Sequence, residues 1–224
     1  MKDLQENIVP SENQNKTDYF SEGNGGLKIL FVGNSISRHA PKPDMGWYGD
    51  WGMAASEAEK DYLHLIVAKI KEKYDPNVSF SIAQVANFER TFFEMDAAQH
   101  YKDAIDFKAD IIVMFFGANV KKEYDTMENP PVKFGDAYEN LRNLFVGGRE
   151  NVFVMHSQGF YIRPVLDEEK RAAAKRLGDP FIELGDIQTR EDTHGRYNHP
   201  SDKGMQEIAD LFWSVLEEEV KKRI

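Results

Sequence analysis

Short apolar runs alternate with amphipathic stretches from residue 27 to the end of the chain. The runs end at glycine or polar residues, which is typical of buried β-strands. Ala109–Phe116 is apolar on both faces, as expected for a central strand of a parallel sheet. The pattern predicts five strands, at Leu27–Val32, Val78–Val85, Ala109–Phe116, Asn151–Met155 and Pro180–Leu184.

Between these strands, apolar residues recur at helical spacing. Asp61–Tyr74, for example, carries Leu63, Ile66 and Ile70 on one face. The pattern predicts helices at Asp61–Tyr74, Val132–Phe145, Asp167–Leu177 and Ser201–Lys222, the last capped by Ser201. Strands that alternate with helices indicate a parallel sheet covered on both sides. Right-handed crossovers then give an α/β fold of the flavodoxin-like kind, a three-layer α/β/α sandwich around a five-stranded parallel sheet.

The first 26 residues differ from the rest. They are polar, rich in Asn, Glu, Ser and Gly, and predict an N-terminal tail or surface arm, which leaves residues 27–224 as one domain. Residues 1–20 contain no apolar core of a signal peptide, and no run of about 18 apolar residues occurs anywhere. The sequence as written therefore predicts a soluble, cytoplasmic protein, and secretion after removal of a signal peptide stays open.

Composition narrows the possible functions. Hydrophobic residues make up 41% of the chain, enough for a substantial core. The absence of cysteine excludes disulfides, a thiol nucleophile and cysteine-ligated metals. The formal net charge of −10 argues against a nucleic-acid partner, which requires a basic face.

Ligands of parallel sheets bind beyond the carboxyl ends of the strands, and three polar segments are expected at that edge. Taken singly, each has a plain alternative: Ser35 could cap a helix or belong to a phosphate loop, Asn119 could end a strand, and His199 could lie in a surface turn. The segments are Gly33-Asn34-Ser35, Gly117-Ala118-Asn119 and His199-Pro200-Ser201-Asp202-Lys203-Gly204.

In this order and at these positions, the three segments resemble the sequence blocks of the SGNH (GDSL-like) hydrolase superfamily, across roughly residues 27–222. The resemblance implies Ser35 as nucleophile, His199 as general base, and Asn119 with the Ser35 backbone N–H as oxyanion donors. It also implies the same flavodoxin-like sandwich. Members of the superfamily are mostly esterases and lipases, and many deacetylate carbohydrates.

Three positions depart from the family pattern. Arg196 stands where the family has the Asp that orients the histidine, and Arg cannot accept the imidazole N–H. A backbone carbonyl is the first alternative and Asp192 the second. The usual second-block glycine, an oxyanion donor, is also missing, and Asn87 is the candidate for its role. Val120 replaces the family Asp that follows the block-three Asn.

The segment Ser37–Ser56 is too long for a simple strand-to-helix connection and carries Trp47 and Trp51. These rings either seal the edge of the core or close over a substrate, where their faces suit sugars. The candidate substrate-binding residues are Asn34, Asn87, Trp47 and Trp51.

These residues predict a serine esterase or deacylase that acts on a small O-acyl ester, with an acetylated carbohydrate as the preferred substrate. The alternative is a catalytically weak SGNH-fold protein that binds a glycan or another ligand. A metal reading of Asp192, His194 and His199 lacks a fourth ligand at useful spacing, so neither a metal nor a cofactor is expected.

Overall fold

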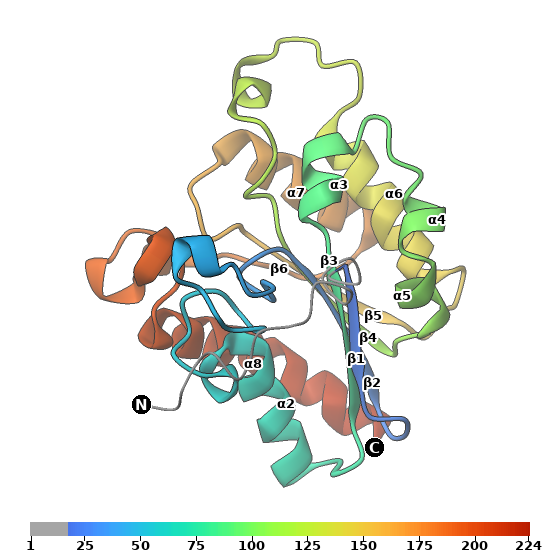
Figure 1. Cartoon of the computed structure of the whole chain (residues 1–224). Helices are drawn as coiled ribbons and strands as arrows, with labels where there is room; N and C mark the ends of the chain where they lie inside the picture. The colour runs from blue at the N-terminus through green and yellow to red at the C-terminus, as the bar shows by residue number, and fades with distance from the viewer. Residues whose placement is uncertain (1–17) are drawn as a thin grey trace.

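A six-stranded sheet forms the middle layer of the computed structural model, which describes residues 18–224 (Figure 1). The strand order is β1-β3-β2-β4-β5-β6, and all neighbouring strands are parallel except the β1–β3 pair at one edge. The strands are β1 (Tyr19–Glu22), β2 (Lys28–Gly33), β3 (Ser79–Gln84), β4 (Ile111–Phe115), β5 (Phe153–Ser157) and β6 (Phe181–Ile182).

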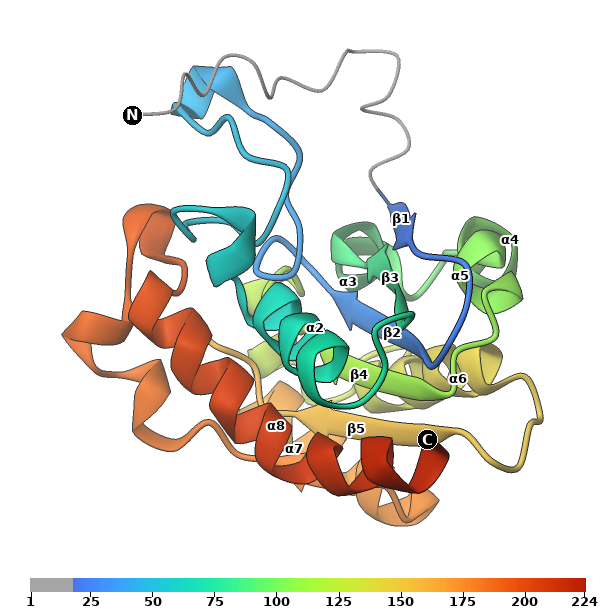
Figure 2. The same cartoon turned by 90° about the horizontal axis from the view of Figure 1, so that it is seen from below.

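Helices cover both faces of the sheet, which confirms the three-layer α/β/α sandwich. Helices α2 (Tyr62–Lys73) and α8 (Asp202–Arg223) lie on one face, and α3 (Ala86–Thr91), α6 (Phe134–Val146) and α7 (Pro164–Leu177) on the other (Figures 1 and 2). The shorter helices are α4 (Ala97–His100), α5 (Lys102–Asp106) and the 3-10 turns η2 (Pro43–Met45), η3 (Ala58–Lys60), η4 (Lys122–Thr126), η5 (Gly185–Gln188), η6 (Glu191–Thr193) and η7 (Arg196–Asn198). Within residues 18–224, no helix is long and apolar enough to cross a membrane.

Strand β1 corrects two of the sequence predictions. Part of the predicted tail, Tyr19–Glu22, pairs antiparallel with β3, so the sheet has a sixth strand that is not parallel. The segment is short and half polar, and its stability comes from the backbone ladder on the open edge of β3, which no sequence pattern reveals. The remainder of that prediction, residues 1–17, lies outside the described residues.

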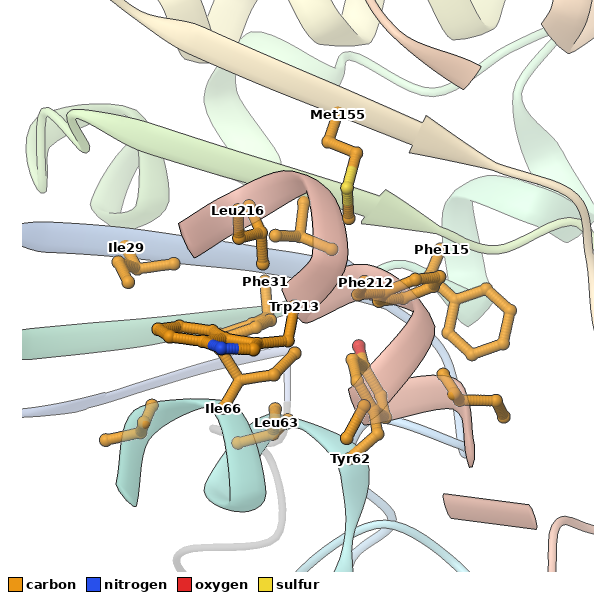
Figure 3. Packing of buried hydrophobic residues seen from close by; sticks show 14 of the residues in the cluster. Ile29, Phe31, Tyr62, Leu63, Ile66, Phe115, Met155, Phe212, Trp213 and Leu216 are labelled. Carbon is orange, nitrogen blue, oxygen red and sulfur yellow. The ribbon is translucent and has the colours of Figure 1, made fainter. Parts of the chain in front are cut away.

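The core on the α2 and α8 side is built from interlocking aromatic rings (Figure 3). Phe212 of α8 lies edge-on to Phe115 of β4 and to Tyr62 of α2, with ring centroids 5.4 and 5.7 Å apart. The Tyr62 hydroxyl leaves this core to form a 2.7 Å hydrogen bond with Ser37 Oγ. Through this hydrogen bond, the core beneath α2 and α8 also holds the loop that follows β2 in place.

We expect Phe212→Ala to lower the free energy of unfolding by about 3–5 kcal/mol, because it removes a fully buried ring and leaves a cavity. Phe93→Ala is the matched control, since 47% of that residue is exposed, and should cost well under half as much. Urea denaturation of both variants measures the difference. Equal losses would show that the α8 interface is not a principal source of stability.

Candidate active site

A tight turn presents Ser35 at the carboxyl end of β2. The Asn34 carbonyl accepts the N–H groups of Ser37 and Arg38 at 2.9 and 3.0 Å, which folds the chain back immediately after the strand. Gly33 is required by close packing, because a Cβ at this position would lie 1.8 Å from Ser37 Oγ. The turn therefore places a serine hydroxyl above the middle of the sheet.

His199 meets this serine from the other end of the chain. Its Nε2 lies 2.7 Å from Ser35 Oγ. Its Nδ1 lies 2.9 Å from the carbonyl oxygen of Tyr197, so Nδ1 carries the proton and Nε2 can accept the Ser35 O–H. The Tyr161 hydroxyl lies farther from Nδ1, at 3.4 Å. Burial lowers the pKa of His199, and the nearby His39 adds to this effect. The imidazole is consequently neutral at neutral pH and can take a proton.

Ser35 and His199 line a polar cavity of about 360 Å³. Asn119 lines it as well, so the three residues singled out by the sequence share one pocket. Two segments that no motif marked also contribute, namely Asp18 before β1 and Arg90 of α3. The complete lining is Asp18, Ser35, His39, Met45, Met53, Gln84, Ala86, Asn87, Arg90, Asn119, Tyr197 and His199.

Several solved structures of similar fold are named as esterases or lipases. Est24, a carbohydrate acetylesterase from Sinorhizobium meliloti, superposes with a TM-score of 0.59 at 12% identity, over 86% of this chain and 99% of its own. A protein of Bacteroides ovatus assigned as a GDSL-like lipase superposes with a TM-score of 0.59 at 16% identity, over 87% of this chain and 100% of its own. A family two carbohydrate esterase from Clostridium thermocellum in complex with cellohexaose superposes with a TM-score of 0.56 at 15% identity, over 87% of this chain. This chain has the SGNH hydrolase fold.

This chain spans 65% of the length of that family two esterase, and 64% of an active-site mutant of a Clostridium thermocellum family two esterase. No family model matches the sequence, and no curated protein matches it significantly. The likeness therefore concerns the fold.

Within this SGNH fold, a strained turn aims the Tyr197 carbonyl at His199. Tyr197 and Asn198 have φ angles of 59° and 57°, a left-handed conformation that non-glycine residues rarely adopt. Contacts with the 37–56 loop hold the turn: the Tyr197 hydroxyl donates to the Met45 carbonyl at 2.9 Å, and its ring lies edge-on to Trp47. The loop thus supports the residue whose carbonyl orients the imidazole.

Asp192, the second alternative for orienting His199, lies elsewhere, and that prediction is wrong. Its carboxylate pairs with Lys203 of α8 and with Arg190, and half of its side chain is exposed. The 3-10 turn η6 directs it toward the start of α8, a path that sequence spacing alone does not reveal. Arg196 stacks on the Tyr197 ring instead of facing His199. Among residues 18–224, no three His, Asp or Glu side chains group to hold a metal ion.

The predicted substrate-binding residues separate into two groups. Asn87 lines the pocket and donates to Asp18 at 3.1 Å. Asn34, Trp47 and Trp51 do not line the pocket, and their assignment is corrected. Asn34 is 1% exposed and donates its amide to the buried carboxylate of Glu89.

The two tryptophans build the 37–56 loop itself. Trp47 is 6% exposed and donates Nε1–H to the His39 carbonyl at 2.9 Å, and Trp51 donates to the Ala55 carbonyl at the same distance. Their rings meet edge-on, with centroids 5.5 Å apart. Because the indoles pack inside the loop, the loop reaches the pocket through His39, Met45 and Met53.

Asn119 is held by two residues of α3, Glu89 and Arg90, neither of which a sequence motif marked. Its Nδ2 donates to Glu89 Oε2 at 2.5 Å, and its Oδ1 accepts from Arg90 at 2.9 Å. Glu89 is fully buried, and this burial raises the pKa of its carboxyl group. The only sign of Glu89 in the sequence is an acidic residue directly after the apolar Phe88, in the short segment that follows the second predicted strand.

The pKa of His199, followed by imidazole NMR, should lie below the ordinary histidine value of about 6.5 because the ring is buried. The Nδ1–H tautomer should dominate above that pKa, since Tyr197 accepts from Nδ1. Asp192→Asn is the control and should leave both properties unchanged, because Asp192 pairs with Lys203 and Arg190. A raised pKa, or one that moves in Asp192→Asn, would contradict this geometry.

Proposed function

We propose that this protein is a serine esterase in which Ser35 is the nucleophile and His199 the general base. The observation that carries the proposal is the 2.7 Å contact between Ser35 Oγ and the unprotonated Nε2 of His199. A nucleophile bonded to a base whose second nitrogen is itself oriented is the arrangement of serine hydrolases.

The reaction then follows two matched steps. His199 Nε2 takes the hydroxyl proton as Ser35 Oγ bonds to the ester carbonyl carbon, and the carbonyl oxygen becomes an oxyanion. Asn119 and the Ser35 backbone N–H donate to that oxygen. The bond to the alcohol breaks, and His199 returns the proton to the departing oxygen. Water attacks the acyl-enzyme in the same way, which releases the acid and restores Ser35.

The carbonyl behind His199 favours an ester over an amide as substrate. A carboxylate would stabilise the imidazolium by a charge-assisted hydrogen bond, whereas the Tyr197 carbonyl offers only a dipole. Because the protonated form of His199 is then less stabilised, the substrate must react readily, as an ester with a good leaving alcohol does. The same carbonyl fills the place of the missing family Asp, which favours an active enzyme over a binding protein of the same fold.

The pocket favours a small acyl group on a polar alcohol. Its walls carry Asp18, Gln84, Asn87 and Arg90, and a long acyl chain would require apolar walls instead. Polar side chains of this kind match the hydroxyl groups of a sugar, and Est24, of similar fold, is a carbohydrate acetylesterase. An acetylated carbohydrate is therefore the preferred substrate.

Ser35→Ala and His199→Ala should each reduce aryl-acetate hydrolysis by about a thousandfold, since either change removes the dyad. Ser214→Ala, on the exposed face of α8, is the matched control and should keep parental activity. Steady-state kinetics at pH 7.5 measures all three variants. Parental turnover in Ser35→Ala would refute the proposal.

Asn119→Ala should lower kcat by about 100-fold and change KM little, because its amide would stabilise charge that exists only in the transition state. Steady-state kinetics with one aryl ester gives kcat and KM separately and so shows which of the two changes. A change confined to KM would instead assign Asn119 to substrate binding.

A further inference from the structure

Glu89 joins the loops that follow the three adjacent strands at the middle of the sheet. It belongs to α3, directly after β3, and accepts from Asn34 Nδ2 after β2 at 3.0 Å. It also accepts the Gly117 backbone N–H and Asn119 Nδ2, both after β4. Gly117 presents its N–H with a φ of 137°, which few residues other than glycine adopt. One carboxylate thus ties the nucleophile turn to the loop that carries Asn119.

The Asn119 amide is fixed at both ends by consecutive residues of α3. Glu89 accepts from Nδ2, and Arg90 donates to Oδ1. A flipped amide would direct its oxygen at the Glu89 carboxylate and its NH₂ at the Arg90 guanidinium, and both contacts would be repulsive. An amide NH₂ has two N–H groups, and Glu89 takes one, which leaves the second for a ligand in the pocket.

The chemistry of the three donors requires a carboxylate at position 89. All three are N–H groups, and they approach both oxygens of Glu89. A glutamine has one carbonyl oxygen, so its NH₂ would face a donor on one side. Burying a carboxylate is costly, and it is retained only where hydrogen bonds satisfy both oxygens. The Glu89 carboxylate therefore fixes the directions of these three N–H donors and also joins the loops that carry them.

We propose that Glu89 and Arg90 are positioning residues that set the Asn119 amide as the oxyanion donor. The inference rests on the proposed esterase function. The helix α3 that carries them occupies the chain segment where the resembled family has its second-block glycine donor. In this chain the segment supplies no such glycine, and its residues Glu89 and Arg90 instead position the Asn119 amide.

The test is a double-mutant cycle in aryl-acetate hydrolysis. Glu89→Gln should lower kcat by about 10-fold or more and change KM little, because the misplaced amide no longer meets the oxyanion. In the Asn119→Ala background the same change should cost less than about 3-fold, since its target is gone. Arg90→Ala should show the same coupling with a smaller loss. Equal losses in both backgrounds would overturn the proposal.

Glu169→Gln is the matched control. Glu169 also accepts from a glycine N–H, that of Gly135, and from the Tyr124 hydroxyl, but it does not line the pocket. This variant should keep the parental kcat. Arg90 is exposed, so Arg90→Ala should fold and still test the coupling if Glu89→Gln unfolds.

The side-chain amide signals of Asn119 in ¹⁵N NMR provide a readout that does not depend on hydrolysis. Its two N–H protons should be widely separated in the parent, because one faces a carboxylate, and should converge in Glu89→Gln. Unchanged signals would refute the positioning role. If the parent shows no Ser35-dependent hydrolysis, the esterase proposal fails, and these signals alone decide the role of Glu89.

Discussion

The hydrogen bond between Ser35 Oγ and His199 Nε2 joins two loops that are 164 positions apart in the sequence. Its geometry depends on the sandwich, because β2 at the centre of the sheet delivers Ser35 while the loop before α8 delivers His199. Helix α8 is anchored by Phe212 in the aromatic core, and Tyr62 of the same core forms a hydrogen bond with Ser37, two residues after Ser35. Packing in the core therefore sets the distance between Ser35 Oγ and His199 Nε2.

The site compensates for a missing carboxylate with backbone strain. Left-handed conformations at non-glycine residues cost of order 1–3 kcal/mol each, and here two adjacent residues, Tyr197 and Asn198, adopt them. The bond from Tyr197 to Met45 and the contact with Trp47 offset part of this cost. This contact accounts for the long loop after Ser35, because the loop spans the distance from Ser35 to the turn that orients His199.

The parts of this structure that were predictable are those encoded by local patterns. Apolar runs located the parallel strands, and glycine or proline beside Ser35, Asn119 and His199 marked the loops of the site. Strand β1 was not predictable, because its stability comes from the edge of β3. The choice between Asp192 and the Tyr197 carbonyl depended on the path of two 3-10 turns, which residue spacing does not encode. Glu89 was missed because its partners come from two other loops, one after β2 and one after β4, far from it in the sequence.

The central claim is that His199 activates Ser35 as a nucleophile. A fluorophosphonate probe forms a covalent bond to such a serine, and mass spectrometry of the digested protein locates the adduct. The account predicts one adduct per chain, on Ser35, formed far more slowly in His199→Ala than in the parent. An adduct on another residue, no adduct at all, or equal labelling rates in the two proteins would contradict it.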